Sequence, residues 1–388
     1  MDKSAGRPVY KKHNSFVELR HHHDDAQARE RARVQALRDD PAPARGLSAA
    51  HRALLEQVFA DLLDQPGPET PPGFALAPHV VEEMATLPDE SLPKYLVHRY
   101  RYEVFPQRNI VDDYPPYLQI EPSSVCNFRC VFCFETDPTF TDKNSGFMGR
   151  MGLDLFKEVI DRAEGNVEFL SLASRGEPMV CPDIIPMLEY TRGKFLNLKM
   201  NTNASLLDEA RAHAILSGGV KTLVFSVDAA KEPLYSQLRV NGKLSVVLKN
   251  IERFQNLRTT QYTDSKIITR VSGVKFSDDQ DLDSMTEMWG GLVDQVAFVQ
   301  YNPWENVYNE ALNGMTTPCS DLWRRMFVWW DGKVNPCDVD YKSALSVGTF
   351  PGQGLSELWR SANYTALREA HLNQARSSVG PCNRCTVV

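Results

Sequence analysis

The sequence predicts an α/β fold in which six parallel strands, alternating with helices, form a partial (β/α)6 barrel. Two observations lead to this expectation. Short apolar runs recur through the middle of the 388-residue chain. Segments with an apolar residue at every third or fourth position, the helical period, lie between these runs. Strands that are apolar on both faces and alternate with helices are typical of a parallel sheet.

The six predicted strands follow one another between residues 117 and 302. In chain order they are YLQIEP (117–122), VEFLSLAS (167–174), LNLKMNTN (196–203), KTLVFSVD (221–228), KIITRVSGV (266–274) and DQVAFVQYN (294–302). Six units are fewer than the eight that close a TIM barrel, so we expect a TIM-like barrel that is incomplete. By analogy with closed barrels, functional side chains should lie at the carboxyl ends of these strands.

Five helices are predicted between the strands. In chain order they are GLDLFKEVIDRAE (152–164), DIIPMLEYTRGK (183–194), LLDEARAHAILSGG (206–219), LSVVLKNIERFQNL (244–257) and DLDSMTEMW (281–289). Gly218 and Gly219 suit the end of the third helix, because glycine readily adopts the conformation that terminates a helix.

The barrel occupies the second of three predicted regions. Residues 1–110 should form an N-terminal tail and a helical extension, since the segment 21–40 is highly charged and the segment 48–65 carries a single apolar stripe. Residues 111–310 should hold the barrel. Residues 311–388, with four of the eight cysteines, should form a small C-terminal domain.

Composition excludes several classes of protein. The net charge of −7 argues against binding to nucleic acid phosphates. The chain has no run of about 18 apolar residues, and its first residues lack the apolar core of a secretory signal. We therefore expect a cytoplasmic protein with neither a membrane nor a nucleic acid as partner. In that reducing compartment, clustered cysteines are more often metal ligands or catalytic thiols than disulfides.

The cysteines fall into three groups. Cys126, Cys130 and Cys133 form a C-x3-C-x2-C run directly after the first predicted strand, Cys181 stands alone, and the rest lie in the last 70 residues, namely Cys319, Cys337, Cys382 and Cys385. Three thiolates on a four-iron cluster leave one iron open to a ligand that is not protein. A zinc site with a distant histidine is the alternative, since no histidine lies between His98 and His213.

The first group resembles the radical S-adenosylmethionine (SAM) superfamily, whose members carry a C-x3-C-x-aromatic-C loop matched here by Cys126, Cys130, Phe132 and Cys133. The resemblance implies that the three cysteines hold a [4Fe-4S] cluster whose open iron binds SAM, with Phe132 against the adenine. It further implies that an electron from a flavodoxin or ferredoxin-type reductant cleaves SAM to methionine and a 5′-deoxyadenosyl radical, which removes a hydrogen atom from the substrate.

The segment SRGEP (174–178) is similar to the family's Gly-Gly-Glu-Pro turn, which holds the methionine amino group of SAM. Gly176 and Glu177 match that turn, whereas Arg175 replaces its first glycine. Arg175 either faces the substrate or forms an ion pair with Glu177 or another acid, and both readings stay open. The resemblance places further polar residues where relatives contact the ribose or the methionine carboxylate: Asn201, Asn203, Ser226, Asp228, Arg270 and Ser272.

The last four cysteines resemble the truncated auxiliary-cluster domain called twitch, a short form of the SPASM domain found in radical SAM dehydrogenases. The resemblance implies a second [4Fe-4S] cluster on Cys319, Cys337, Cys382 and Cys385. Four thiolates leave no open iron, as expected for electron transfer. A structural four-cysteine zinc site is the alternative.

These features favour an enzyme that oxidises a secondary alcohol of a sugar or aminocyclitol to a ketone, with the auxiliary cluster accepting an electron. Similar chains occur in sugar and aminocyclitol assembly, including antibiotic pathways. One rival is a sugar epimerase, in which Cys181 would return a hydrogen atom to the substrate, although a small buried cysteine is the commoner reading. Other rivals are a dehydratase, a peptide-modifying enzyme and a simple electron carrier.

Overall fold

The computed structural model describes residues 16–19, 24–64, 73–173, 175–303, 305 and 307–388. These residues divide into two compact units, and each is described by itself. One lies within residues 1–20 and 113–388, and the other spans residues 21–112.

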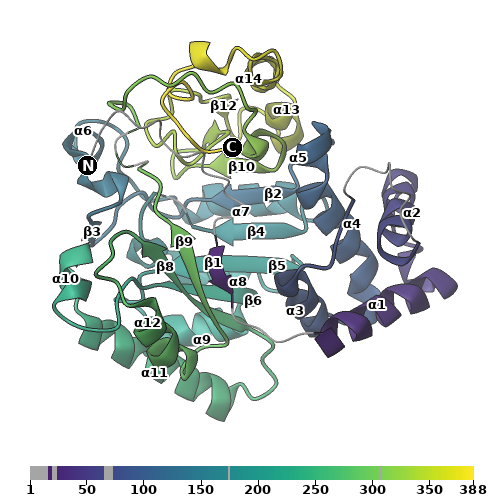
Figure 1. Ribbon diagram of the computed structural model, residues 1–388, viewed down its shortest axis with the longest axis horizontal. Coiled ribbons are helices and arrows are strands. Elements are labelled where there is room, and N and C mark those ends of the chain that lie inside the picture. The colour runs from purple at the N-terminus through teal and green to yellow at the C-terminus, as the bar shows by residue number, and fades with distance from the viewer. Residues whose placement is uncertain (1–15, 20–23, 65–72, 174, 304, 306) are drawn as a thin grey trace. The chain divides into compact units, whose positions relative to one another are not determined.

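The larger unit is built on one sheet that contains all six predicted strands. They are β2 (Tyr117–Ile120), β4 (Phe169–Leu172), β5 (Asn197–Thr202), β6 (Val220–Ser226), β8 (Ile268–Lys275) and β9 (Gln295–Gln300). Each strand pairs in parallel with the next one in this series. The six-stranded parallel arrangement expected from the sequence is therefore confirmed (Figure 1).

The five predicted helices are also present and cover the outer face of this sheet (Figure 1). They are α7 (Leu153–Ala163), α8 (Ile184–Tyr190), α9 (Glu209–Ser217), α11 (Leu244–Gln261) and α12 (Leu282–Gly290). Helix α9 ends where predicted, because Gly219 takes a φ of +87°, a conformation that glycine adopts without strain. Asp208 caps the start of α9 by accepting from the backbone N–H of Arg211.

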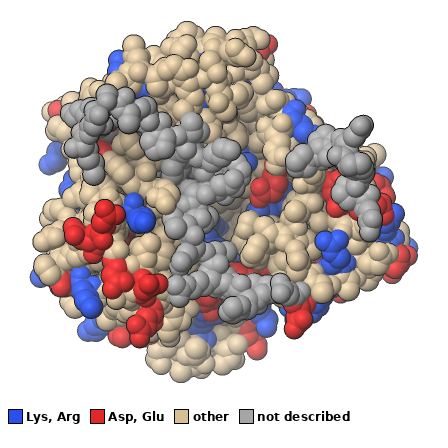
Figure 2. Space-filling model, in the orientation of Figure 1, with Lys and Arg blue, Asp and Glu red and all other residues tan. Residues whose placement is uncertain are grey.

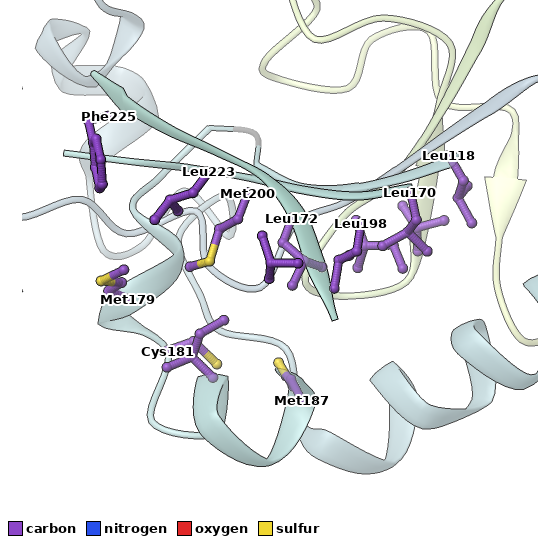
Figure 3. Packing of buried hydrophobic residues seen from close by; sticks show 14 of the residues in the cluster. Leu118, Leu170, Leu172, Met179, Cys181, Met187, Leu198, Met200, Leu223 and Phe225 are labelled. Carbon is purple, nitrogen blue, oxygen red and sulfur yellow. The ribbon is translucent and has the colours of Figure 1, made fainter. Parts of the chain in front are cut away.

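Alternation along the strands separates an apolar outer face from a more polar inner face. Leu172, Met200 and Leu223 project toward the helices and pack in the core (Figure 3). Successive side chains of a strand point to opposite faces, so neighbouring residues such as Asn201 point the other way. The inner face therefore carries the polar residues that the sequence places at the strand ends.

The sheet continues beyond the barrel at both edges. Next to β2 lies β10 (Arg325–Val328), which pairs with it in parallel, followed by the antiparallel strands β11 (Lys333–Asn335) and β12 (Gly348–Thr349). At the other edge β1 (Phe16–Leu19), in the expected tail, pairs antiparallel with β9. The C-terminal region also contains α13 (Leu355–Trp359) and α14 (Ala362–Leu372). The four C-terminal cysteines lie in the loops around these elements: Cys319 before β10, Cys337 after β11, and Cys382 and Cys385 after α14.

The smaller unit is helical in its described residues, as expected for the N-terminal extension. It contains α1 (Asp24–Asp39), α2 (Ala49–Leu63), α3 (Pro78–Thr86), α4 (Leu92–Glu103) and α5 (Phe105–Arg108). The predicted stripe of α2 buries Leu55, Val58, Phe59 and Leu62. Ser48 caps this helix by accepting from the backbone N–H of His51 at 3.1 Å. The described helices include none with the length and apolarity needed to cross a membrane.

Acidic side chains gather over α12 and the turn before it on the face shown in Figure 2. The exposed acids there are Asp278, Asp279, Asp281, Asp283 and Glu287. Such a cluster repels phosphate groups, in keeping with the negative net charge of the chain.

Candidate functional site

The three cysteines of the first group lie together in the loop that follows β2. Cys130 belongs to a short strand, β3 (Arg129–Cys130), which pairs antiparallel with β7 (Arg239–Val240). Burial raises the pKa of the Cys133 thiol, and the charges of Cys130 and Cys126 raise it further. Cys130 is buried, and Cys126 and Cys133 are half-buried in this loop.

Two of these sulfur atoms accept hydrogen bonds from the surrounding chain. The backbone N–H of Phe128 donates to Cys126 Sγ at 3.4 Å, and Arg239 Nη1 donates to Cys130 Sγ at 3.7 Å. Burial raises the pKa of the Cys126 thiol to about 12. Thiols of this kind become thiolates when a metal centre binds them, so the donor set suits an iron–sulfur cluster. Among the described residues, no group of three or more Cys, His, Asp or Glu side chains is placed so that it could hold a single metal ion.

The turn after β4 packs tightly against this cysteine loop. A Cβ atom on Gly176 would lie 2.5 Å from the backbone of Ser124 and 2.6 Å from the carbonyl oxygens of Ser123 and Val125. The backbone N–H of Glu177 donates to the Val125 carbonyl at 3.1 Å. Only glycine fits at position 176, and the close approach fixes the Gly-Glu-Pro turn beside the cysteines.

Glu177 joins the ends of β4 and β5. Its carboxylate accepts from the Thr202 hydroxyl and the Asn203 backbone N–H, both at 2.7 Å, and from the Met179 N–H at 3.2 Å. Burial raises the pKa of Glu177, while these hydrogen bonds oppose the rise. Thr202 was not predicted as a site residue. Its hydroxyl lies between two predicted site positions, Asn201 and Asn203, at a strand end, and this is the signal that could have found it.

Asn203 lies between Glu177 and the cysteine loop. Its side-chain amide donates to Asn127 Oδ1 at 2.9 Å and approaches Cys126 Sγ at 4.0 Å. Its Oδ1 accepts from the backbone N–H of Ser205 at 2.9 Å. Asn203 therefore orients the cysteine loop in this structure, in addition to any contact with a cofactor.

The remaining polar candidates lie along neighbouring strands. Ser226 and Ser272 are opposite each other in the β6–β8 register and are half-buried. Arg270 Nε donates to Gln295 Oε1 at 2.6 Å. Asn201 Oδ1 is buried and has no hydrogen-bond partner among the described residues. A buried acceptor without a donor is costly, so this atom fits a site that a polar ligand completes.

Asp228 does not face an open site. It is fully buried, and its Oδ1 accepts from the backbone N–H of Val274 at 2.6 Å. Its Oδ2 forms an ion pair with Arg239 Nε at 2.5 Å. The expected contact of Asp228 with the ribose therefore gains no support here, because both carboxylate oxygens have partners from the protein.

Arg175 takes the ion-pair alternative, with Glu121 rather than Glu177 as its partner. Its Nε donates to Glu121 Oε2 at 2.7 Å, and its Nη1 donates to the Tyr341 carbonyl at 2.9 Å. The guanidinium carbon lies 4.3 Å from the centre of the Trp329 ring, and the residue is 4% exposed. A carboxylate buried at the end of β2 requires such a cation. This geometry ties three strand ends together and does not support a catalytic Arg175.

Glu121 was missed by the sequence analysis, although the glutamate directly after an apolar strand is a usable signal. It also accepts from the backbone N–H groups of Arg175 at 3.2 Å and Trp330 at 3.3 Å. Trp330 in turn donates from its ring to the Phe147 carbonyl at 3.0 Å. Glu121 is thus the buried acceptor on which the ends of β2, β4 and β10 converge.

Cys181 lies in the core on the helix side of the sheet. Figure 3 shows it near Met179 and Met187, below the strands. It is fully buried, and its sulfur lies 3.6 Å from the Met151 carbonyl oxygen. Of the two interpretations of Cys181, a small buried cysteine or a hydrogen-atom donor, this position fits the first. It gives no support to a catalytic thiol.

Phe132 belongs to an aromatic group at the ends of β8 and β9. Its ring centre lies 5.6 Å from that of Phe276, which lies 4.9 Å from that of Tyr301. Phe132 is 6% exposed. The sequence analysis did not include Phe276 and Tyr301, although each directly follows an observed strand.

Glu135, which was also not predicted as a site residue, is buried and lies two positions after Cys133. Burial raises the pKa of its carboxyl to about 8, and Arg129, at 3.3 Å, opposes that rise. Neither carboxylate oxygen has a hydrogen-bond partner among the described residues. The cysteine loop therefore contains a further polar group suited to contact with a bound ligand.

The four C-terminal cysteines lie in the segment expected to hold the second cluster. Burial raises the pKa of Cys382, and the charges of Cys319 and Cys385 raise it further. Burial raises the pKa of Tyr364, and the charges of Cys337 and Cys319 contribute to this rise. Backbone N–H groups donate to Cys337 Sγ at 3.3 Å and to Cys385 Sγ at 3.4 Å. Sulfur atoms that accept N–H hydrogen bonds are usual around iron–sulfur clusters.

Arg376 holds the C-terminal cysteine turn in place. It is 1% exposed and donates to the carbonyl oxygens of Thr317, Cys385 and Val387, each at 2.8 Å. A buried guanidinium favours a negatively charged group nearby. A cluster with four thiolate ligands supplies that charge, so Arg376 fits the expected auxiliary cluster.

Comparison with known proteins identifies the two parts of the larger unit. Residues 120–287 match the radical SAM superfamily. Residues 319–386 match SPASM, described as an iron-sulfur cluster-binding domain. Both cysteine groups fall inside these two segments.

Among curated relatives, a GTP 3′,8-cyclase from Clostridium botulinum is 24% identical over 190 residues, which are 48% of this chain and 56% of the relative. The chain thus spans about half the length of the curated relatives that it matches. Streptococcus suis SuiB bound to S-adenosylmethionine has a TM-score of 0.52 and 15% identity, covering 79% of this chain and 80% of that one.

A crystal structure of BtrN in complex with AdoMet and 2-DOIA has a TM-score of 0.47 and 16% identity, covering 71% of this chain and 94% of that one. The two domain matches, together with the six parallel strands, show that this chain contains a radical SAM domain followed by a C-terminal SPASM domain.

Proposed function

We propose that this radical SAM enzyme is an oxidoreductase that converts a secondary alcohol of a sugar or aminocyclitol to a ketone. The radical SAM domain binds SAM and one [4Fe-4S] cluster, and the SPASM domain binds an auxiliary cluster. The observation that carries the proposal is the set of four cysteines in the segment that matches SPASM, whose strand β10 pairs with β2 of the barrel sheet. A cluster with four thiolates has no free iron for substrate, which favours a role as electron acceptor.

The proposed ligands follow from the placement of the cysteines. Cys126, Cys130 and Cys133 hold the SAM-binding cluster, and the auxiliary cluster is held by the remaining set of Cys319, Cys337, Cys382 and Cys385. When bound, SAM supplies the radical that removes a hydrogen atom from the substrate.

The chain's own residues position SAM. Gly176 brings the turn close to the cysteine loop, and Glu177 is held in place by Thr202 and Asn203. We assign Asn201, with its buried Oδ1, to the polar part of SAM, and Phe132 to the adenine. Ser226, Ser272 and Arg270 complete the proposed polar wall.

An aromatic contact joins the two cysteine sites. Phe134, next to Cys133, stacks on Tyr341, four residues after Cys337, with ring centres 4.9 Å apart and planes inclined by 16°. The Tyr341 hydroxyl donates to Asp137 Oδ2 at 2.9 Å. This stack fixes the two loops relative to each other and supports electron transfer between the substrate region and the auxiliary cluster.

The proposed oxidation balances as follows. A carbon that bears a hydroxyl group loses its hydrogen atom, the hydroxyl group loses its proton, and the auxiliary cluster takes the remaining electron. The product is a ketone that is two hydrogens lighter than the substrate. Each turnover consumes one SAM and releases one 5′-deoxyadenosine, with a flavodoxin or ferredoxin-type protein as the proposed source of the first electron.

The proposal is tested by incubating anaerobically reconstituted protein with SAM, a chemical reductant and a panel of sugars and aminocyclitols. Mass spectrometry is expected to find a product two hydrogens lighter, which hydroxylamine traps as an oxime. A product of unchanged mass would instead identify an epimerase, and loss of water a dehydratase. A peptide that alone gains or loses mass would identify peptide modification as the function.

Cys181 separates oxidation from epimerisation through this thiol. Because its side chain is fully buried on the helix side of the sheet, Cys181→Ala is expected to retain ketone formation. Removing one small buried sulfur should lower stability by about 1–2 kcal/mol at most. Product analysis and thermal unfolding check this expectation. Complete loss of product from a folded Cys181→Ala variant with both clusters would restore Cys181 as a hydrogen donor.

A further inference from the structure

A two-stranded ribbon places an arginine directly against one cysteine of the SAM-binding loop. Arg239, in β7, is the register partner of Cys130 in β3. The backbone N–H of Val131 donates to the Leu238 carbonyl at 3.0 Å and helps to hold the two segments together. Arg239 is 6% exposed, and its Nη1 donates to Cys130 Sγ at 3.7 Å. The arginine is therefore fixed by backbone pairing, not by its side chain alone.

A buried carboxylate balances the charge of this arginine. Asp228, just beyond the end of β6, lies with its Oδ2 2.5 Å from Arg239 Nε. Its other oxygen is anchored by the backbone N–H of Val274 at 2.6 Å. The result is a buried row of Cys130, Arg239 and Asp228, in which the cation lies between the sulfur and the carboxylate.

We propose that Arg239 and Asp228 are positioning residues that set the reduction potential of the SAM-binding cluster, in opposite directions. Reduction adds one negative charge to a cluster. A guanidinium that donates to a ligand sulfur stabilises that charge and raises the potential, whereas a buried carboxylate behind it lowers the potential. This inference rests on the assignment of Cys130 as a cluster ligand, made under the proposed function, and is independent of the substrate.

The pairing has a functional reason. Cleavage of SAM needs a strongly reducing cluster, and a buried cation alone would make the cluster less reducing. Asp228 offsets that effect while Arg239 keeps its hydrogen bond to Cys130 and orients the ligand. The two residues thereby combine a rigid contact to the sulfur with little net charge.

The test is a redox titration of the reconstituted full chain, followed by electron paramagnetic resonance of the SAM-binding cluster. Arg239→Gln is expected to shift its midpoint potential to a more negative value, and Asp228→Asn to a more positive value. Arg239→Lys keeps the charge but loses the planar fork, so its shift should be smaller than that of Arg239→Gln. The auxiliary cluster in the same sample serves as an internal reference and should not shift.

A remote pair of the same chemistry supplies the matched control. Arg258 Nη1 and Asp294 Oδ2 lie 2.8 Å apart, and Asp294 directly precedes β9, at the amino end of the strands, whereas the cysteine loop follows the carboxyl end of β2. Arg258→Gln and Asp294→Asn should leave both potentials unchanged. Structural damage would move Arg239 and Asp228 variants in the same direction, so opposite shifts are specific to the proposed electrostatic role.

Shifts of the same sign, or no shift in folded variants that retain the cluster, would overturn the proposal. If Arg239→Gln loses iron, the midpoint potentials of Arg239→Lys and Asp228→Asn still test the proposal. An unchanged midpoint potential in Asp228→Asn would contradict it. Failure of the underlying assignment looks different, because wild-type protein would then contain no cluster that responds to SAM.

Discussion

Replacing Cys126, Cys130 and Cys133 together with alanine is expected to remove about four of about eight irons and to abolish 5′-deoxyadenosine formation. The three thiols are the only protein ligands proposed for the SAM-binding cluster, so SAM loses both its binding iron and its source of electrons. The four-cysteine site lies on other segments and should keep its cluster. Iron analysis and quantification of 5′-deoxyadenosine after chemical reduction check both expectations.

Cys181→Ala is the matched control for the triple substitution, because Cys181 lies outside both cysteine sets and within the apolar core. This variant should retain both clusters and cleave SAM normally. Continued SAM cleavage by the triple variant, or an unchanged iron content, would contradict the assignment of these three cysteines.

Replacing Cys382 and Cys385 with alanine is expected to leave SAM cleavage intact while ketone formation collapses. The substitution removes two of four ligands of the auxiliary cluster but none from the barrel loop. A substrate radical would then have no electron acceptor and would be quenched or returned unchanged. The measurement is the ratio of ketone to 5′-deoxyadenosine, which should fall from about one toward zero if each SAM cleavage drives one oxidation.

Folding must be checked in this double variant, because cluster domains owe part of their stability to the bound metal. The control is the iron content and SAM response of the barrel cluster, which should match those of the wild type. Normal ketone yield from a folded variant that lacks the auxiliary cluster would contradict the electron-acceptor role. Zinc in place of iron in the C-terminal site, after anaerobic expression with ample iron, would contradict it as well.

The barrel could be predicted from the sequence because its six apolar runs alternate with segments of helical period. All six predicted strands and all five helices between them are present. The sheet extensions could not be predicted, since β10 and β1 stand outside this alternation and pair with strands far away in the chain. The two-residue strands β3 and β7 carry no periodicity at all, although they place Arg239 against Cys130.

The first cysteine set could be recognised because its spacing is local, and the second because it resembles a known cysteine pattern, whereas the ion pairs beside the cysteines depend on the fold. Glu121 and Arg175 are 54 residues apart in sequence and meet only because β2 and β4 are neighbours. Because this neighbourhood depends on the fold, the sequence alone left open whether Arg175 faces the substrate or forms an ion pair. The resemblance placed Asp228 where relatives contact the ribose or the methionine carboxylate, but in the fold Arg239 of β7 forms an ion pair with it.

The central claim, one open cluster and one closed cluster in the same chain, is tested most directly by Mössbauer spectroscopy of the wild-type protein enriched in ⁵⁷Fe, with and without SAM. The account predicts two [4Fe-4S] clusters in equal amounts and a SAM-induced change confined to one iron, about one eighth of the iron signal. A single cluster, or two clusters of which neither responds to SAM, would contradict it.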